Sequence, residues 1–253
     1  ATKLKFVARA GAGIDKVDYP YLTSRGIKLV NAPEGNRDAV GEHAIGMLLS
    51  LFHNLNRSNR EVKSGKWDRE GNRGMELKGK TLGIYGYGFM GSSLARKLQG
   101  FECRVLAYDK YKSDVDLNWV EKVGLDEFFQ EVEILSIHVP LTRETNELFD
   151  SEYLSKFTKL KVIINTSRGE VLKLNAVNEA FDSGKLHGAV LDVLENEKIS
   201  SLTESEQAEF DKLANNPRVL LSPHVAGWTF ESYERINEVL VSKLKKEGLA
   251  HVS

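Results

Sequence analysis

The stretch that most constrains the fold is residues 81–109, TLGIYGYGFMGSSLARKLQGFECRVLAYD. It opens with a short apolar run, 81–85, continues through an amphipathic segment, 89–98, and closes with a second apolar run that ends in Asp109. Between the first two parts lie three glycines in the pattern G-x-G-x-x-G, namely Gly86, Gly88 and Gly91. Strand, glycine-rich turn, helix and a second strand ending in an acid is the order that holds a dinucleotide on a parallel sheet. We therefore expect a dinucleotide site here.

Each glycine of this pattern has its own physical reason. Gly86 lets the chain turn sharply out of the strand, and Gly88 has no side chain to keep a pyrophosphate away from the backbone. Gly91 lets the helix pack against the strand, so that the positive end of its dipole meets the phosphates. Asp109, eighteen residues after Gly91, can accept hydrogen bonds from the ribose hydroxyls of adenosine and would repel a 2′-phosphate. The pattern therefore favours NAD over NADP.

Length and composition limit the remaining possibilities. The chain has 253 residues, enough for one large or two moderate domains, and its net charge of −1 with 28% charged residues lacks the basic field of a nucleic-acid-binding protein. The single cysteine, Cys103, is expected to be a buried thiol in a reducing compartment. No apolar run approaches the ~20 residues of a membrane span, and the N-terminus lacks the apolar core of a signal peptide. We expect a soluble, cytoplasmic protein without nucleic-acid or membrane partners.

Apolar runs of strand length alternate with helical patterns along the chain. Strands are predicted at residues 4–8, 27–31, 81–85, 103–108, 131–139, 162–165, 187–191 and 219–221. Helices are predicted at residues 18–24, 38–63, 89–98, 151–156, 175–183, 200–216 and 230–246. This alternation predicts an α/β fold with a Rossmann-like, doubly wound parallel sheet that is covered on both faces.

Polar residues and one glycine stand just past the C-terminal ends of several predicted strands. They are Gly86, Asp109, His138, Arg168, Asp192 and His224. In an open parallel sheet these strand ends line the ligand crevice, so we expect the six residues to surround one site.

Eight blocks of the sequence resemble those of the NAD-dependent D-2-hydroxyacid dehydrogenases, and they occur in the order of that family over nearly the whole chain. They are ARAGAGIDKVD (8–18), NAPEGN (31–36), GEHAIGMLL (41–49), GYGFMG (86–91), HVPLT (138–142), NTSRGEV (165–171), LDVLENE (191–197) and SPHVAG (222–227). The resemblance implies NAD as the cofactor, a small 2-hydroxy or 2-oxo acid as the substrate, and hydride transfer between them.

The resemblance also implies three catalytic residues. Arg168 matches the arginine that holds the substrate carboxylate and polarises the C2 oxygen, a task that suits a planar, permanently charged fork. His224 matches the acid–base residue that takes the hydroxyl proton. Glu197 matches the carboxylate that stabilises the imidazolium and sets its tautomer. The family usually has proline after this glutamate, where the chain has Lys198, and Glu195 is a competing candidate.

Further contacts follow from the same resemblance. Besides the three glycines and Asp109, the implied cofactor residues are Phe89, Met90, His138, Val139, Pro140, Thr166, Ser167, Asp192, Ala226 and Gly227. The implied substrate residues are Gly11, Ala12 and Gly13, whose amides would face the carboxylate, and Arg9 and Asn36 near the far end of the substrate. Asp192 and the carbonyl of Thr166 would orient the nicotinamide carboxamide. No metal ion is implied.

The resemblance implies two domains. Residues 36–228 would form the NAD-binding domain, entered by a long crossing helix at about 38–63. Residues 1–35 would be a remnant of the substrate-binding domain, and residues 229–253 a helix that returns to it. Because family members have further strands and helices ahead of Lys3, we expect a truncated chain with an incomplete second α/β domain. Trp67 and Arg69 would reach a partner subunit, as in the homodimers of the family.

Three blocks bear on the substrate. RAGAGID, GKWDRE and GMELKGKTLGI are most similar to the branch of the family that converts 3-phosphoglycerate to 3-phosphohydroxypyruvate in serine biosynthesis. The alternatives are a glycerate or glyoxylate/hydroxypyruvate reductase, and a non-catalytic NAD-sensing interaction protein on the same scaffold. A nucleotide-binding methyltransferase is disfavoured, because its glycine loop lacks the downstream arginine, glutamate and histidine.

Overall fold

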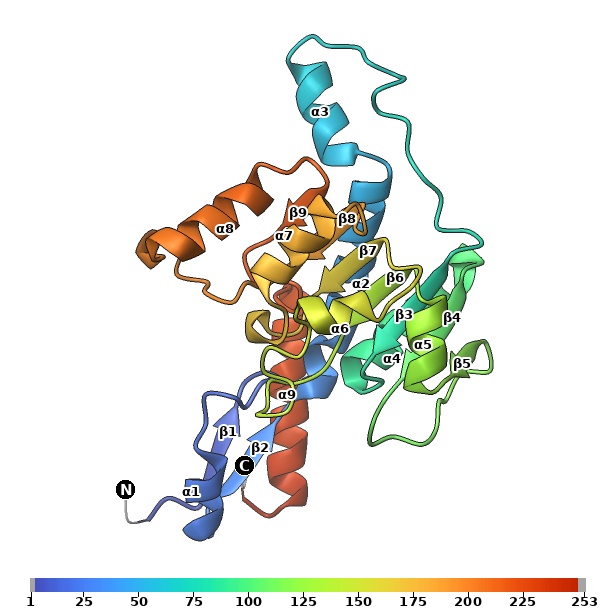
Figure 1. Ribbon diagram of the computed structural model, residues 1–253. Coiled ribbons are helices and arrows are strands. Elements are labelled where there is room, and N and C mark those ends of the chain that lie inside the picture. The colour runs from blue at the N-terminus through green and yellow to red at the C-terminus, as the bar shows by residue number, and fades with distance from the viewer. Residues whose placement is uncertain (1–2, 250–253) are drawn as a thin grey trace.

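A computed structural model describes residues 3–249, and its centre is a seven-stranded parallel sheet (Figure 1). Its strands are β3 (Thr81–Tyr85), β4 (Arg104–Tyr108), β5 (Val120–Lys122), β6 (Ile134–Ile137), β7 (Val162–Asn165), β8 (Gly188–Leu191) and β9 (Val219–Leu221). They lie in the order β5-β4-β3-β6-β7-β8-β9. Strand order therefore reverses between β3 and β6, which is the switch point where open α/β sheets bind ligands. The predicted Rossmann-like, doubly wound sheet is confirmed.

Helices cover both faces of this large sheet. They are α2 (Pro33–Phe52), α4 (Phe89–Leu98), α5 (Leu125–Glu131), α6 (Ser151–Ser155), α7 (Leu174–Asp182) and α8 (Glu204–Ala214), with short 3-10 turns at η1 (Gln99–Phe101), η2 (Gly169–Val171) and η3 (Ile199–Ser201). Buried residues of α2 and α4 share one core cluster, and those of α5, α6 and α7 share the other.

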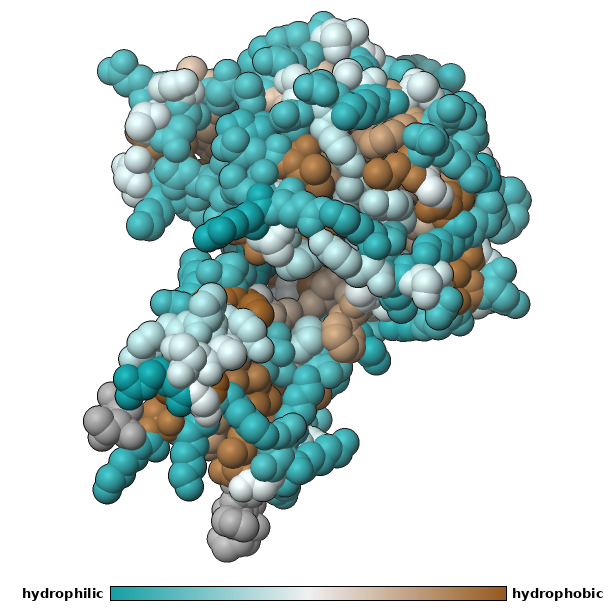
Figure 2. All heavy atoms as spheres, turned by 60° about the horizontal axis from the view of Figure 1, so that its bottom comes forward, coloured by the Kyte–Doolittle hydropathy of each residue, from teal (hydrophilic) through white to brown (hydrophobic). Residues whose placement is uncertain are grey.

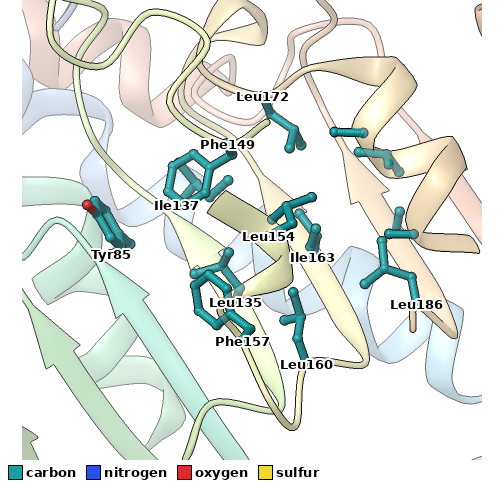
Figure 3. Packing of buried hydrophobic residues seen from close by; sticks show 14 of the residues in the cluster. Tyr85, Leu135, Ile137, Phe149, Leu154, Phe157, Leu160, Ile163, Leu172 and Leu186 are labelled. Atoms are coloured by element: carbon teal, nitrogen blue, oxygen red, sulfur yellow. The ribbon is translucent and has the colours of Figure 1, made fainter. Parts of the chain in front are cut away.

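The alternation of side chains along each strand produces these two cores. In β7, Val162 and Ile164 belong to the cluster with α2 and α4, whereas Ile163 belongs to the opposite one. Figure 3 shows this second cluster, in which Ile163 lies near Leu154 and Phe149. Because every residue of β6, β7 and β8 is buried, the sheet is a rigid base for whatever follows its strands.

A small lobe stands apart from the large sheet. It consists of the parallel pair β1 (Phe6–Arg9) and β2 (Lys28–Asn31), helix α1 (Tyr19–Ser24), and helix α9 (Phe230–Lys246), which also packs along α2. Its core cluster contains the buried residues Val30, Ala32, Ile236 and Leu240. Figure 2 shows the small lobe and the large body separated by a recess, with apolar surface on the lobe. Leu4, Tyr19 and Tyr21 are among the exposed apolar side chains there.

The entry into the large sheet differs from the single helix predicted at 38–63. Helix α2 begins earlier, with Pro33 in its first turn, where the missing N–H of proline costs nothing. The helix ends at Phe52, and Asn54 adopts a left-handed conformation (φ 52°) before α3 (Leu55–Lys63) starts in a new direction. No residue of α3 is buried within the described chain, and α3 projects from the body in Figure 1.

Two elements between residues 110 and 133 were not predicted. Strand β5 has only three residues, two of them exposed, and lies at the edge of the sheet, so its apolar signal is too short to see. Helix α5 buries only Phe128 among its own residues. Among residues 3–249, no helix combines the length and apolar character needed to cross a membrane.

Candidate active site and nucleotide site

The strand register brings the predicted site residues together. Tyr85 pairs with Tyr108 on one side and Ile137 on the other, and Asn165 pairs with Ile137 and Leu191. The residues that follow these strand ends therefore stand side by side along one edge of the large sheet. They are Asp109, Gly86, His138, Thr166 and Asp192.

The glycine loop after β3 has the geometry that its pattern predicts. Gly86 has φ 98°, and a Cβ on it would lie 2.8 Å from the carbonyl oxygen of His138. A Cβ on Gly91 would overlap the carbonyl oxygen of Gly86, so helix α4 can approach the strand only without that side chain. A Cβ on Gly88 would meet no described atom within 4 Å. The loop is therefore closely packed at Gly86 and Gly91, whereas the space beside Gly88 is unfilled by described atoms.

Helix α4 presents backbone donors at this opening. Gly88 is its N-cap, and in residues 3–249 no side chain caps this helix end. The amides of the first turn, including those of Phe89 and Met90, are the groups that an α-helix cannot satisfy internally. Together with the helix dipole they form a ready site for a phosphate group.

Asp109 is held in place by three backbone amides. One carboxylate oxygen accepts from Tyr87 N at 2.7 Å, and the other accepts from Tyr111 N and Lys112 N, both at 2.9 Å. Tyr87 lies inside the glycine loop, so the carboxylate also fixes that loop. Carboxylate oxygens can accept more than one hydrogen bond, which leaves room for ribose hydroxyls.

Two buried polar atoms at the strand ends have no hydrogen-bond partner among the described residues. They are Nδ1 of His138 and Oγ1 of Thr166. Native structures rarely leave such atoms unpaired, which makes both atoms candidates for contact with a ligand. Burial lowers the pKa of His138 to about 4, and its Nε2 lies 2.8 Å from the hydroxyl of Ser136. The imidazole is therefore neutral at physiological pH.

Asn165 shapes the turn that carries Arg168. Its side-chain oxygen accepts from the amide of Ser167 at 3.0 Å and from the hydroxyl of Ser167 at 2.9 Å, and its amide group donates to the carbonyl of Arg168 at 2.9 Å. A Cβ on Gly169 would overlap the carbonyl oxygen of Leu194. The turn is thus fixed on both sides before the Arg168 side chain begins.

The guanidinium of Arg168 reaches the small lobe. Its Nε and Nη2 donate to one oxygen of Asp15 at 2.9 and 2.8 Å, and its Nη1 donates to the carbonyl of Ser167 at 2.7 Å. A Cβ on Gly13 would overlap Nη2. The arginine predicted for catalysis and the 11–13 turn predicted for the substrate carboxylate are therefore in contact.

The structure distinguishes between the two glutamate candidates. Nδ1 of His224 lies 2.7 Å from a carboxylate oxygen of Glu197. Glu195 instead accepts a hydrogen bond from Leu174 N at 2.6 Å and lies 3.5 Å from Lys173 Nζ. Of the two glutamates, Glu197 is therefore the one that contacts His224, although Lys198 follows it.

Asp192 orders the loop that carries His224. Its buried carboxylate accepts from Val225 N at 2.9 Å, Ala226 N at 2.8 Å and the hydroxyl of Ser222 at 2.5 Å, and its carbonyl accepts from His224 N at 2.7 Å. Burial alone would raise the pKa of Asp192, but hydrogen bonds from His43, Ser222 and these amides outweigh it and lower the pKa. The carboxylate therefore stays ionised and holds residues 222–226 against β8.

Three residues at the site were not predicted from the sequence. Asp15 contacts Arg168, while Nε2 of His43 lies 3.0 Å from Ser222 Oγ and 3.5 Å from Asp192. All three lie inside blocks that the family resemblance covers. A pattern of neighbouring letters does not show which side chain across the fold each one meets.

Arg9 and Asn36, the residues predicted to lie near the far end of the substrate, make no hydrogen bond to Arg168 among the described residues. Arg9 is exposed, donates to the carbonyl of Ala10, and lies against Gly11, which has φ 136°. Asn36, in α2, lies 2.5 Å from where a Cβ on Gly227 would stand. Oδ1 of Asn36 is buried and has no partner among the described residues. Among residues 3–249, no hydrogen bond joins Arg9 to Asn36 or to Arg168.

Comparisons with known proteins show which family the chain resembles. Residues 45–226 match the family model of the D-isomer specific 2-hydroxyacid dehydrogenase, NAD binding domain. A hydroxypyruvate reductase of Thermotoga maritima is 36% identical over 96% of this chain and 78% of its own length. A D-3-phosphoglycerate dehydrogenase of Synechocystis is also 36% identical, over 95% of this chain but 44% of its own length. The chain thus spans less than half of that relative.

Solved structures show the same fold. The crystal structure of a D-lactate dehydrogenase from Aquifex aeolicus, complexed with NAD and lactic acid, matches 97% of this chain and 77% of its own, with a TM-score of 0.84 and 31% sequence identity. The fold and the strand-end site define an NAD-binding oxidoreductase domain. The chain belongs to the D-isomer specific 2-hydroxyacid dehydrogenase family.

Proposed function

We propose that this chain transfers a hydride between NAD and a small 2-hydroxy acid, with Arg168, Glu197 and His224 as the catalytic residues. The observation that carries this proposal is the contact between His224 Nδ1 and Glu197 at 2.7 Å. It orients the ring and leaves Nε2 without a hydrogen bond among the described residues, as an acid–base residue requires.

His224 moves the proton of the reaction. A carboxylate beside Nδ1 favours the tautomer with the proton on Nδ1, so that Nε2 carries the lone pair. In the oxidative direction Nε2 takes the proton of the C2 hydroxyl, while the C2 hydrogen leaves with its electron pair and the carbonyl forms. NAD supplies the acceptor for that hydride. Glu197 stabilises the imidazolium that results, and in reduction the imidazolium returns the proton to the C2 oxygen.

Arg168 binds and orients the acid. A guanidinium matches a carboxylate with two parallel hydrogen bonds, and its permanent charge polarises the C2 oxygen as charge develops there. The amides of Gly11, Ala12 and Gly13 would add donors beside it, since Gly13 lies against the guanidinium. Asn36 and Arg9 would face the far end of the acid.

The proposed nucleotide residues are those that the family resemblance implies, and the residues that follow the strand ends support them. The amides of Phe89 and Met90 would bind the pyrophosphate, and Asp109 the adenosine ribose, which favours NAD over NADP. His138, Val139 and Pro140 would line the adenine and ribose side. The carbonyl of Thr166, with Ser167, Asp192, Ala226 and Gly227, would surround the nicotinamide.

The proposed substrate is 3-phosphoglycerate, oxidised to 3-phosphohydroxypyruvate at the start of serine biosynthesis. The blocks RAGAGID and GKWDRE and the Synechocystis relative support it. The second candidate is hydroxypyruvate or glyoxylate, because the Thermotoga reductase matches over a much larger share of its own length. Under both candidates we propose a cytoplasmic homodimer, in which exposed α3 and Trp67, 79% exposed, contact a second copy.

The test compares substrates and then two matched variants. Steady-state turnover is measured with NAD and 3-phosphoglycerate, and with NADH and hydroxypyruvate or glyoxylate. Glu197→Gln is expected to lower kcat by roughly ten- to a hundredfold, whereas Glu195→Gln, which removes the same charge two residues away, keeps it. NADH binding without turnover of any of these acids would support the NAD-sensing alternative. Equal loss in both glutamate variants would contradict the assignment of Glu197.

A further inference from the structure

Arg168 is held by a residue from the other side of the site. Asp15 lies 153 positions earlier in the chain, in the loop between β1 and α1, and one of its oxygens accepts from both Nε and Nη2 of Arg168. Only 24% of the Arg168 side chain and 18% of the Asp15 side chain are exposed. The ion pair is thus partly shielded and connects the small lobe to the turn after β7.

The donors of the guanidinium can be accounted for individually. A guanidinium has five N–H groups in a fixed plane. Asp15 occupies the Nε–H and one Nη2–H, and the carbonyl of Ser167 occupies one Nη1–H. One N–H on each terminal nitrogen has no partner among residues 3–249. These two donors are what a substrate carboxylate needs for a bidentate contact.

The plane of the guanidinium is restricted from a second direction. The loop that carries Asp15 also contains Gly13, and any Cβ there would overlap Nη2. The backbone of the loop therefore lies directly against the guanidinium while the Asp15 carboxylate binds one edge of it. Packing on one side and a charged acceptor on another leave little freedom for the arginine to rotate.

We propose that Asp15 is a positioning residue, which orients Arg168 so that its two remaining terminal N–H groups face the carboxylate of the acid substrate. Arg168 is the carboxylate-binding residue of the function proposed above, so the role of Asp15 in turnover depends on that function. A substrate adds a second carboxylate to the guanidinium and leaves Asp15 in place. The small lobe thereby also contributes to catalysis through a side chain that does not touch the substrate.

The opposite role is physically reasonable and gives the opposite result. If Asp15 instead occupied donors that the substrate needs, the acid would have to displace it. Removing Asp15 would then tighten substrate binding. The sign of the change in KM therefore separates a positioning residue from an inhibitory contact.

The experiment compares Asp15→Ala, Asp15→Asn and the control Asp18→Asn with the unchanged chain. Asp18 lies in the same loop and caps α1 by accepting from Tyr21 N, which asparagine can also do. Asp15→Ala is expected to raise KM for the 2-oxo acid and lower kcat, together by about tenfold or more in kcat/KM. Asp15→Asn retains one acceptor oxygen and should recover part of the loss. The kinetic constants of Asp18→Asn should equal those of the unchanged chain. NADH binding, measured by fluorescence, should be the same in all the variants.

A second readout does not depend on turnover. The Nε–H proton of Arg168, followed by NMR, is expected to exchange slowly with water in the unchanged chain and in Asp15→Asn, and rapidly in Asp15→Ala. Slow exchange that is lost in Asp15→Ala supports the positioning role even if none of the acids is turned over, in which case only the proposed function fails. Rapid exchange in the unchanged chain, or a KM that is unchanged or lower in Asp15→Ala, would overturn the inference.

Discussion

The nucleotide side and the acid side of the site are built on very different supports. On the nucleotide side, Gly86, His138 and Asp192 follow strands of a seven-stranded sheet with a large apolar cluster on each face. On the acid side, the loop with Gly13 and Asp15 follows a strand of a two-stranded sheet. A two-stranded sheet has little stability of its own. The positions of the residues on the nucleotide side are therefore fixed by the two apolar clusters of the large sheet. The acid side depends on individual contacts such as Arg168–Asp15.

The largest effect should come from a residue that serves chemistry and leaves the nucleotide side untouched. His224→Asn removes the proposed proton acceptor and should lower kcat by roughly a thousandfold, while NADH binding stays within error. The exposed His187→Asn is the control. Steady-state kinetics with NADH fluorescence titration checks this. Joint loss of turnover and NADH binding would show that the two sides cannot be separated in this way.

Acid should weaken the nucleotide side through His138. Its pKa is about 4 in the folded chain and about 6.5 when unfolded, so below pH 6.5 the unfolded chain binds a proton that the folded chain refuses. The free energy of unfolding therefore falls as pH drops from 6.5 towards 4, by up to about 3 kcal/mol from this group. Urea denaturation at pH 7 and pH 4.5 should show a smaller fall in His138→Gln than in the control His187→Gln. An equal fall in the free energy of unfolding in both variants would rule out His138 as the cause.

Paired glycine variants test each side directly. Gly91→Ala forces α4 away from the carbonyl of Gly86 and should destabilise the large sheet by about 2 kcal/mol and weaken NADH binding. Gly35→Ala places a Cβ 2.6 Å from Ile236 Cα and should loosen α9 and the small lobe at similar cost, with NADH binding retained. Gly46→Ala meets no described atom and is the control. Thermal unfolding and NADH titration distinguish the three, and equal NADH loss in both variants would refute a separate support for each side.

The smallest expected effect concerns the choice of nucleotide. Asp109→Ser removes the charge proposed to repel a 2′-phosphate and keeps a group that can accept from the loop amides. The preference for NADH over NADPH should fall by roughly tenfold, as expected for loss of a hydrogen bond to a charged group. Asp114→Ser removes an exposed carboxylate five residues further along the chain and should leave the ratio of the two dissociation constants unchanged. An unchanged ratio in Asp109→Ser would mean that the loop, rather than this charge, selects the nucleotide.

Sequence reasoning succeeded where an element is long, apolar or bounded by glycine. The bounds of β3, β7, β9, α4 and α9 agree with the predicted ranges. It failed where an element boundary depends on the backbone conformation of a single residue or on contacts made only in the folded chain. The break between α2 and α3 depends on the left-handed conformation of Asn54, which a helical pattern does not reveal.

The site shows the same division. The ends of the strands could be predicted from the sequence. Because the strands are parallel and in register, the residues that follow them lie side by side. The choice between Glu197 and Glu195 could not be made that way, because both lie in one acidic stretch and only the folded loop brings one of them to His224. Asp15 was missed for a related reason. Its partner is 153 residues away, and a single sequence contains no measure of that distance.

The start of α2 and the start of α9 lie side by side, with Gly35 packed on Ile236 and Asn36 against Gly227. The chain therefore leaves the small lobe for the large sheet and returns to it at almost the same point. The nucleotide-binding segment is therefore a domain inserted into the small lobe, with its two ends close together. Domains of this kind tolerate removal and insertion into another chain. A short linker joining residue 35 to residue 228 would close the small lobe on itself. The released segment could be exchanged for another nucleotide-binding unit without lengthening the chain between them.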